Sequence, residues 1–119
     1  MKYEITDKEK ILESLIAIRR QGQLSEINLR LQNKTIEADK VWEFTSRLSI
    51  EIDILIGRMM DEWLSAADLV TAALMDANTK ITSVVTDIKE QIKIASNVIA
   101  VLRYLDDAVA IAKKVVVGV

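Results

Sequence analysis

The residues of this sequence that could do chemistry are its closely spaced acids, because helical bundles often hold divalent metals between carboxylates. The candidates are Asp61-Glu62, Asp106-Asp107 and Asp87-Ile88-Lys89-Glu90. A di-iron centre needs Glu-x-x-His, and the chain contains no histidine. A magnesium-dependent nucleotide hydrolase needs acidic pairs on facing helices, and the only Glu-x-x-Asp, Glu4-Ile5-Thr6-Asp7, precedes the first expected helix. We therefore predict no metal site and interpret these acids as solvated surface residues.

Nucleophilic catalysis has even less support in the sequence. An activated serine or threonine hydroxyl needs an adjacent base, and without histidine or cysteine only a lysine could act. The hydrophobic pattern leaves the lysines on exposed positions. Gly22, Gly57 and Gly118 are isolated, so there is no glycine-rich loop to bind a phosphate. We expect no enzymatic activity and no cofactor.

The composition argues against several other functions. Sixteen basic against eighteen acidic residues give a net charge of −2, and no basic cluster exceeds the pairs Arg19-Arg20 and Lys113-Lys114. Nucleic-acid binding needs a concentrated cationic surface, so it is not expected. The chain has no cysteine, which permits a cytoplasmic location, and its polar first residues do not resemble a secretory signal.

The apolar C-terminal third makes membrane activity the alternative function. Its apolar runs, Val98–Leu102 and Ala108–Ala112, are separated by Arg103, Asp106 and Asp107. A spanning helix needs about 20 nearly uninterrupted apolar residues, so a membrane span is not expected in the resting state. An amphipathic helical bundle that binds lipid or inserts as an oligomer would still fit this pattern.

The elements that must position these residues are helices. Hydrophobic periodicity predicts one all-α domain over residues 1–119, an antiparallel bundle of three long helices at about 7–32, 36–77 and 80–116. Thr6 begins an expected capping box with Glu9, and Asn33-Lys34-Thr35 is an expected turn with Thr35 as the next cap. At Gly22 we expect a kink in the first helix rather than a break.

The second expected helix carries a long apolar stripe with three- and four-residue steps. Its members are Val41, Phe44, Leu48, Ile52, Leu55, Met59, Trp63, Ala66, Val70, Ala73 and Ala77. Residues 48–56 also alternate like a strand that ends at Gly57, but their neighbours are helical, so helix is favoured and Ile50 and Ile54 then lie outside the main stripe. Asp76-Ala77-Asn78-Thr79 is the clearest turn signal, with Thr79 as the expected cap.

The third expected helix carries a heptad pattern typical of a coiled coil. The register is Ile81, Val85, Ile88, Ile92, Ala95, Ile99 and Leu102, then it slips by one residue to Leu105, Val109, Ala112 and Val116. Near the C-terminus, five charged residues from Arg103 to Lys114 share about a third of the circumference. A helix that is apolar over so wide an arc is expected to pack against two or more neighbours.

Two further patterns concern the first and second expected helices. Trp42 and Trp63 are three heptads apart and are expected to fill the core or an interface rather than a cofactor pocket. Glu26 with Arg30, and Glu43 with Arg47, are spaced for ion pairs that support helices by a few tenths of a kcal/mol each.

Three helices in a single copy leave too much apolar surface uncovered, which predicts a two-fold homodimer that completes the bundle. The expected function is that of a non-enzymatic structural or protein-interaction protein, acting by helix-face packing and self-association, with a further protein partner also considered. The expected interface residues are Ile50, Ile54, Trp63, Val98, Val101, Tyr104, Leu105 and Val109.

Overall fold

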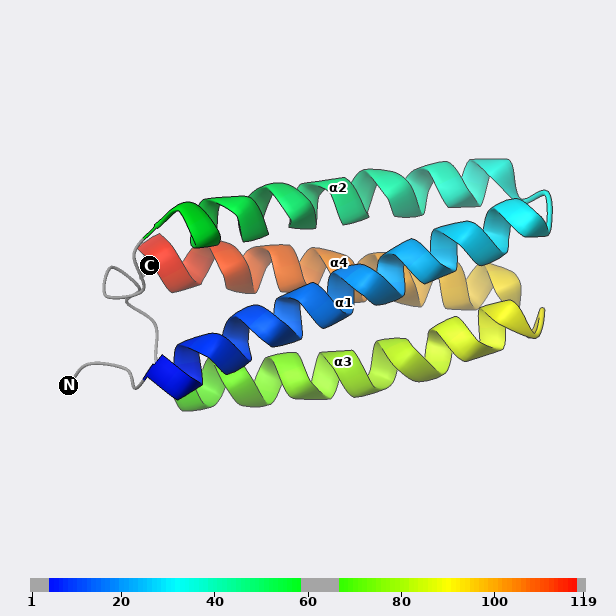
Figure 1. Cartoon of the computed structure of the whole chain (residues 1–119). Helices are drawn as coiled ribbons and strands as arrows, with labels where there is room; N and C mark the ends of the chain where they lie inside the picture. Colours follow the sequence, from blue (N-terminus) through cyan, green and yellow to red (C-terminus); the bar gives the residue numbers. More distant parts are fainter. Residues whose placement is uncertain (1–4, 59–66, 118–119) are drawn as a thin grey trace.

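Four helices make up the part of the chain that the computed structural model describes, which is residues 5–58 and 67–117, with side chains over 8–58 and 70–115. They are α1 (Ile5–Leu31), α2 (Thr35–Gly57), α3 (Ala67–Lys89) and α4 (Ile94–Val117) (Figure 1). The all-helical prediction is confirmed, but three helices was the wrong number. The second and third expected helices, 36–77 and 80–116, are divided differently and form three elements.

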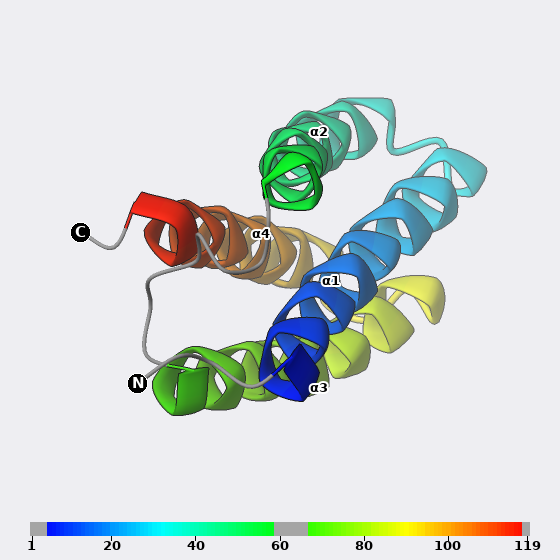
Figure 2. The same cartoon turned by 60° about the vertical axis from the view of Figure 1, so that its left-hand side comes forward.

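The helices form two antiparallel hairpins that lie side by side, with both turns at the same end (Figure 1). α1 packs against α2 and α3, and α4 packs against the same two helices, so that α1 and α4 meet across the diagonal (Figure 2). The bundle measures 48 × 22 × 20 Å. α4 therefore has three neighbours, which confirms that its wide apolar arc packs against more than one helix.

The core is built from one stripe on each helix, with buried side chains three and four residues apart. The buried hydrophobic residues are Ile11, Leu15, Ile18 and Leu29 on α1; Ala38, Val41, Leu48, Ile52 and Leu55 on α2; Leu74, Ala77, Ile81, Val85 and Ile88 on α3; and Val98, Val101, Leu105, Ala108, Val109, Ala112 and Val115 on α4. The five charged residues between Arg103 and Lys114 are all exposed, as the periodicity predicted.

α2 ends at Gly57, inside the helix expected over 36–77; the sequence left open whether Gly57 would kink or break that helix. Arg58 adopts an extended conformation, and its backbone N–H donates to the carbonyls of Ile54 and Leu55 at 3.1 and 3.3 Å. Glycine has the lowest helix propensity after proline, which is consistent with an end at this position. Because residues 48–56 are helical, their strand alternative is excluded.

The turn expected at Asp76-Ala77-Asn78-Thr79 is wrong, since these residues lie inside α3. Ala77 is buried in the core, and Asp76 forms an i,i+4 ion pair of 3.0 Å with Lys80. The Thr79 hydroxyl donates to the carbonyl of Met75 at 3.0 Å instead of capping a new helix. Core packing and local bonds therefore outweigh the turn preference of these side chains.

The second hairpin turns at residues 90–93, which the sequence assigned to one long heptad helix. The N–H of Ile92 bonds the carbonyl of Asp87 at 2.8 Å and that of Gln91 bonds Ile88 at 3.0 Å, which together form a Schellman motif. Gln91 takes the left-handed position with φ 62°. Because that position usually holds glycine or asparagine, the sequence did not reveal the turn, and the expected single seam from 81 to 102 is wrong.

The first hairpin turns where it was expected, with Asn33 in the left-handed position of a second Schellman motif. Thr35, however, is the first residue of α2 and not its cap; Lys34 precedes it without a side-chain capping bond. Gln32 donates its side-chain N–H to the carbonyl of Ile88 at 2.7 Å, which joins the first turn to the end of α3. The Thr6 side chain lies outside the described residues.

Gly22 lies within α1, so a break at this position is excluded. A Cβ placed on Gly22 would lie 2.6 Å from Thr45 Oγ1 on α2 and 3.0 Å from Leu105 Cδ2 on α4. The absence of a side chain therefore lets α1 approach both helices closely at this point.

Candidate interaction surface

α2 carries two stripes of residues with the same spacing on different sides. The inner stripe is buried and consists of Ala38, Val41, Thr45, Leu48, Ile52 and Leu55. The outer stripe advances by alternating steps of four and three, and all of its members are exposed: Ile36, Lys40, Glu43, Arg47, Ile50 and Ile54. At 3.6 residues per turn the two stripes are centred about 150° apart. We call the outer six residues the α2 outer face; among the described helices, none lies on the side of α2 that faces away from the bundle (Figure 2).

Apolar exposure is concentrated in the first hairpin. On the α2 outer face, Ile36 is 70% exposed, Ile50 58% and Ile54 44%. Within the described part of the chain, eight of the eleven exposed large hydrophobic side chains lie between residues 24 and 56. These eight are Leu24, Ile27, Leu31, Ile36, Trp42, Ile50, Ile54 and Ile56, against Met75, Ile92 and Ile99 elsewhere. Scattered apolar residues are ordinary on a surface, whereas a concentration of this kind is typical of an interaction site.

An ion pair occupies the middle of the α2 outer face. Arg47 donates to the Glu43 carboxylate at 2.7 Å, which confirms the pair predicted from the i,i+4 spacing. The Arg47 guanidinium also lies 4.7 Å from the centroid of the Phe44 ring, a cation–π distance. These contacts hold a positive and a negative group one helical turn apart, between Ile36 on one side and Ile50 on the other.

A second ion-pair group joins α1 to α2 beside this face. Arg30 bonds Glu26 at 2.8 Å, which confirms the other predicted pair, and it also bonds Asp39 of α2 at 3.0 Å. The hydrogen bonds to Glu26 and then to Asp39 raise the pKa of the Arg30 guanidinium above its ordinary value. The Arg30 guanidinium therefore stays charged at neutral pH, and its bonds to Glu26 and Asp39 link α1 to α2.

The structure separates the residues that the sequence proposed as an interface. Ile50 and Ile54 are exposed on the α2 outer face. The four valine and leucine residues of α4 in that set are buried in the bundle of the single chain: Val98, Val101, Leu105 and Val109. Tyr104 is half-buried and packs against the core. Trp63 lies outside the described residues, and Trp42 on α2 is 56% exposed.

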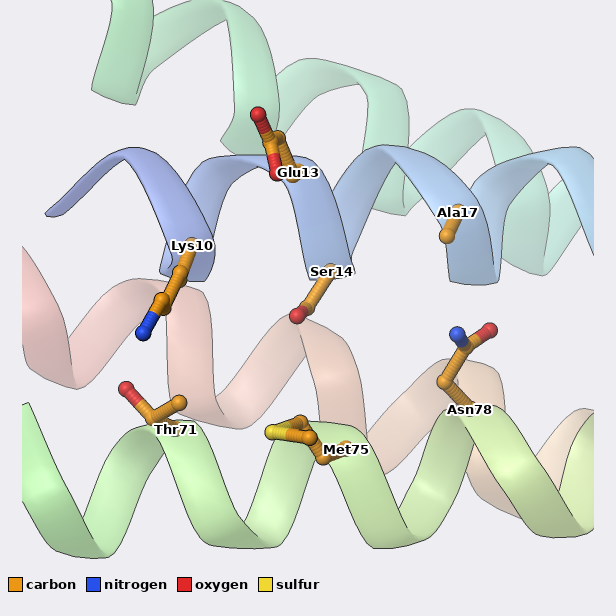
Figure 3. A pocket seen from close by; sticks show the side chains of 7 residues that line it. All are labelled: Lys10, Glu13, Ser14, Ala17, Thr71, Met75 and Asn78. Carbon is orange, nitrogen blue, oxygen red and sulfur yellow. The ribbon is translucent and has the colours of Figure 1, made fainter. Parts of the chain in front are cut away.

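A groove of about 430 Å³ runs between α1 and α3 (Figure 3). Lys10, Ser14, Thr71 and Asn78 direct polar side chains into the space between these helices, whereas Glu13 points away from it (Figure 3). The buried hydroxyl oxygen of Thr71 has no hydrogen-bond partner. The complete lining is Lys10, Glu13, Ser14 and Ala17 from α1 and Thr71, Met75 and Asn78 from α3.

A second groove, of about 300 Å³, lies between α2 and α4 and borders the α2 outer face at Lys40. Val98 and Leu102 line it together with the exposed Ile99, and Lys40 of α2 and the preceding Lys34 line the opposite side. The groove extends the apolar surface of α2 sideways but adds no group of chemical reactivity.

Over the residues that the structure describes, no group of three acidic side chains could hold a metal ion. Asp106 and Asp107 are exposed on α4, and Asp61-Glu62 lies outside the described part. Among the described helices, none has an apolar stretch long enough to cross a bilayer. What the surface offers is therefore the arrangement of apolar and charged side chains on the first hairpin.

The sequence pointed to only part of this surface. It separated Ile50 and Ile54 from the main stripe but did not connect them with Ile36, the most exposed of the three. A usable signal was present, because Ile36, Glu43 and Ile50 are seven residues apart. A second heptad register on a helix that already has a buried one indicates two packing faces.

In comparisons with known proteins, no family model matches this chain, and no curated protein or solved structure matches it either.

Proposed function

We propose that this chain is a non-enzymatic interaction protein that self-associates through the exposed apolar residues of its first hairpin. The observation that carries the proposal is the α2 outer face, where three exposed isoleucines follow a heptad spacing opposite the buried stripe. Helices that bury one such face in their own bundle can bury the other against a partner. The proposal includes a cytoplasmic location, which fractionation of cells expressing a tagged chain would test.

The basis of the proposal differs from the one expected from the sequence alone. Three helices were expected to leave α4 partly uncovered, but a fourth helix covers it within one chain. The apolar surface that remains lies mainly on α1 and α2. The first hairpin, and not the last helix, is therefore the surface through which we expect copies to meet.

The exposed area predicts a reversible association. Ile36, Ile50 and Ile54 together leave the equivalent of about 1.7 whole side chains in water. Full burial of an isoleucine contributes about 1.5–3 kcal/mol, so two such faces give about 5–10 kcal/mol. Association itself costs about 4–15 kcal/mol in lost freedom, so we expect a concentration-dependent dimer rather than a permanent one.

Sedimentation velocity over a concentration series is the direct test. The wild-type chain should shift from monomer to dimer as concentration rises, and the double variant Ile50→Gln, Ile54→Gln should shift the midpoint to at least tenfold higher concentration. Met75→Gln is the control, because Met75 is 58% exposed, as Ile50 is, but lies on α3. A wild-type chain that stays monomeric up to millimolar concentration would refute the proposal. Dye release from anionic liposomes would favour the membrane-active alternative instead.

A further inference from the structure

The order of residues along the α2 outer face restricts how two copies could pair there. Apolar residues stand at the ends, with Ile36 at one and Ile50 and Ile54 at the other. Lys40, Glu43 and Arg47 lie between them, all exposed. Each pairing geometry therefore brings a different set of charges together.

A parallel, in-register pair would place each residue against its own copy. The three isoleucines would then match, but Lys40, Glu43 and Arg47 would each face an identical charge. Like charges directly opposite one another are unfavourable and select against a pairing. In the parallel arrangement, three apolar layers would therefore favour pairing and three layers of like charge would disfavour it.

An antiparallel pair can match both kinds of residue. With the two-fold axis passing between Glu43 and Arg47, residue 36 faces residue 54 of the second copy, 40 faces 50, and 43 faces 47. Ile36 then meets Ile54 at both ends, and Glu43 meets Arg47 twice in the middle. The aliphatic stem of Lys40 packs on Ile50, as lysine stems do on apolar surfaces. An axis shifted by one heptad would match Ile50 with Ile54 but would leave Ile36 without a partner.

Resting on the function proposed above, we infer that the partner of this surface is a second copy of the chain, bound through an antiparallel α2–α2 pair about this axis. The paired segment runs from residue 36 to 54 and is about 27 Å long. Charge and apolar matching together select the geometry. An axis moved half a heptad toward the N-terminus of α2 would pair Lys40 with Glu43, but it would leave Ile50 and Ile54 without partners on the second α2. The other exposed stripe consists of Leu24, Ile27 and Leu31 on α1. Because these three residues are uncharged, they do not favour one orientation or register of a pair over another.

Cysteine cross-linking tests the register, because the chain has no cysteine of its own. Ile36→Cys and Ile54→Cys are prepared separately, mixed in equal amounts and oxidised mildly. The mixture should give a disulfide-linked heterodimer, whereas either variant alone should not, because identical positions are then about 27 Å apart. A mixture of Ile50→Cys and Ile54→Cys is the matched control, with its cysteines about 21 Å apart in this register.

Charge exchange tests the two central pairs. Glu43→Arg alone and Arg47→Glu alone should each raise the dimer dissociation constant about tenfold or more, because like charges then face each other twice. An equimolar mixture of the two variants should restore association as a heterodimer, and the double exchange within one chain should restore the homodimer. Circular dichroism checks that each variant keeps its helix content, since the pair lies on the surface.

The outcomes separate this inference from the function on which it rests. Cross-links from Ile54→Cys alone, or from the Ile50 and Ile54 mixture, would overturn the register while self-association stands. Concentration-dependent dimers that form no cross-link in any combination would place the contact elsewhere and would also overturn the inference. A wild-type chain that is monomeric in sedimentation would defeat both the inference and the proposed function.

Discussion

Replacing Gly22 with alanine tests how closely α1 approaches α2 and α4. In an open helix the change would stabilise the protein by about 0.5–1 kcal/mol, because alanine has the better helix propensity. Here the new Cβ would meet Thr45 Oγ1 at 2.6 Å, closer than real Cβ contacts come, and Leu105 Cδ2 at 3.0 Å. Overpacking of a core costs about 1–3 kcal/mol, so we expect a net loss of about 1–2 kcal/mol.

The assay is urea and thermal unfolding followed by circular dichroism at a fixed low concentration, so that association does not contribute. The expected loss corresponds to a melting temperature lower by roughly 5 °C. Gly57→Ala is the matched control, because a Cβ there meets no atom within 4 Å. We expect this control to be neutral or to raise stability by up to about 1 kcal/mol.

A double-mutant cycle identifies the cause. Thr45→Ala removes the hydroxyl that the new Cβ would meet, together with the bond of 2.7 Å that it donates to the carbonyl of Val41. The Gly22→Ala, Thr45→Ala chain should therefore lose at least about 1 kcal/mol less than the two single changes predict by addition. If Gly22→Ala stabilises the protein as much as Gly57→Ala does, the close approach of α1 is wrong.

Three further changes test other local features. Gln91→Gly should raise the unfolding free energy by about 0.5–1 kcal/mol, because Gln91 has φ 62° and glycine adopts this conformation without steric cost; denaturant titration measures it. Thr71→Val should raise the melting temperature by a few degrees, because it replaces a buried hydroxyl oxygen without a partner by a methyl group of similar size. Hydrogen bonding to Asp76 raises the pKa of Lys80 above its ordinary value. The contribution of this pair to the free energy of unfolding is therefore complete below the pKa that Lys80 has in the unfolded chain, and it is lost as pH rises through the pKa in the folded chain. The difference in melting temperature between wild type and Lys80→Gln should stay constant from about pH 7 to 9 and shrink only in stronger alkali.

The helices and ion pairs that depend on local spacing could be predicted from the sequence. α1 was expected at 7–32 and is Ile5–Leu31, and the turn at Asn33 was expected where it occurs. The pairs Glu26–Arg30 and Glu43–Arg47 form at the predicted i,i+4 positions. These features follow from contacts within a few residues along the chain, which periodicity and turn chemistry describe directly.

The remaining helix ends could not be predicted because they depend on contacts between helices. Asp76 to Thr79 have turn-forming side chains, but Ala77 is held in the core with Leu74 and Ile81. Gln91 occupies a left-handed position that its own preference does not favour, and Gln32 of the other hairpin bonds Ile88 at that helix end. Tertiary packing therefore overrode the local preference at both places.

Dividing the chain into four helices also changes where a partner can bind. A dimer formed through α4 would have to open the bundle, because Val101 and Leu105 are fully buried. Opening exposes a core whose burial supplies much of the folding free energy, so such a dimer would compete with the folded monomer. Contact through the α2 outer face requires no opening, since its isoleucines already lie in water. Association should therefore leave the helix content and the core unchanged, and an oligomer that forms only as the monomer unfolds would contradict the surface identified on α2.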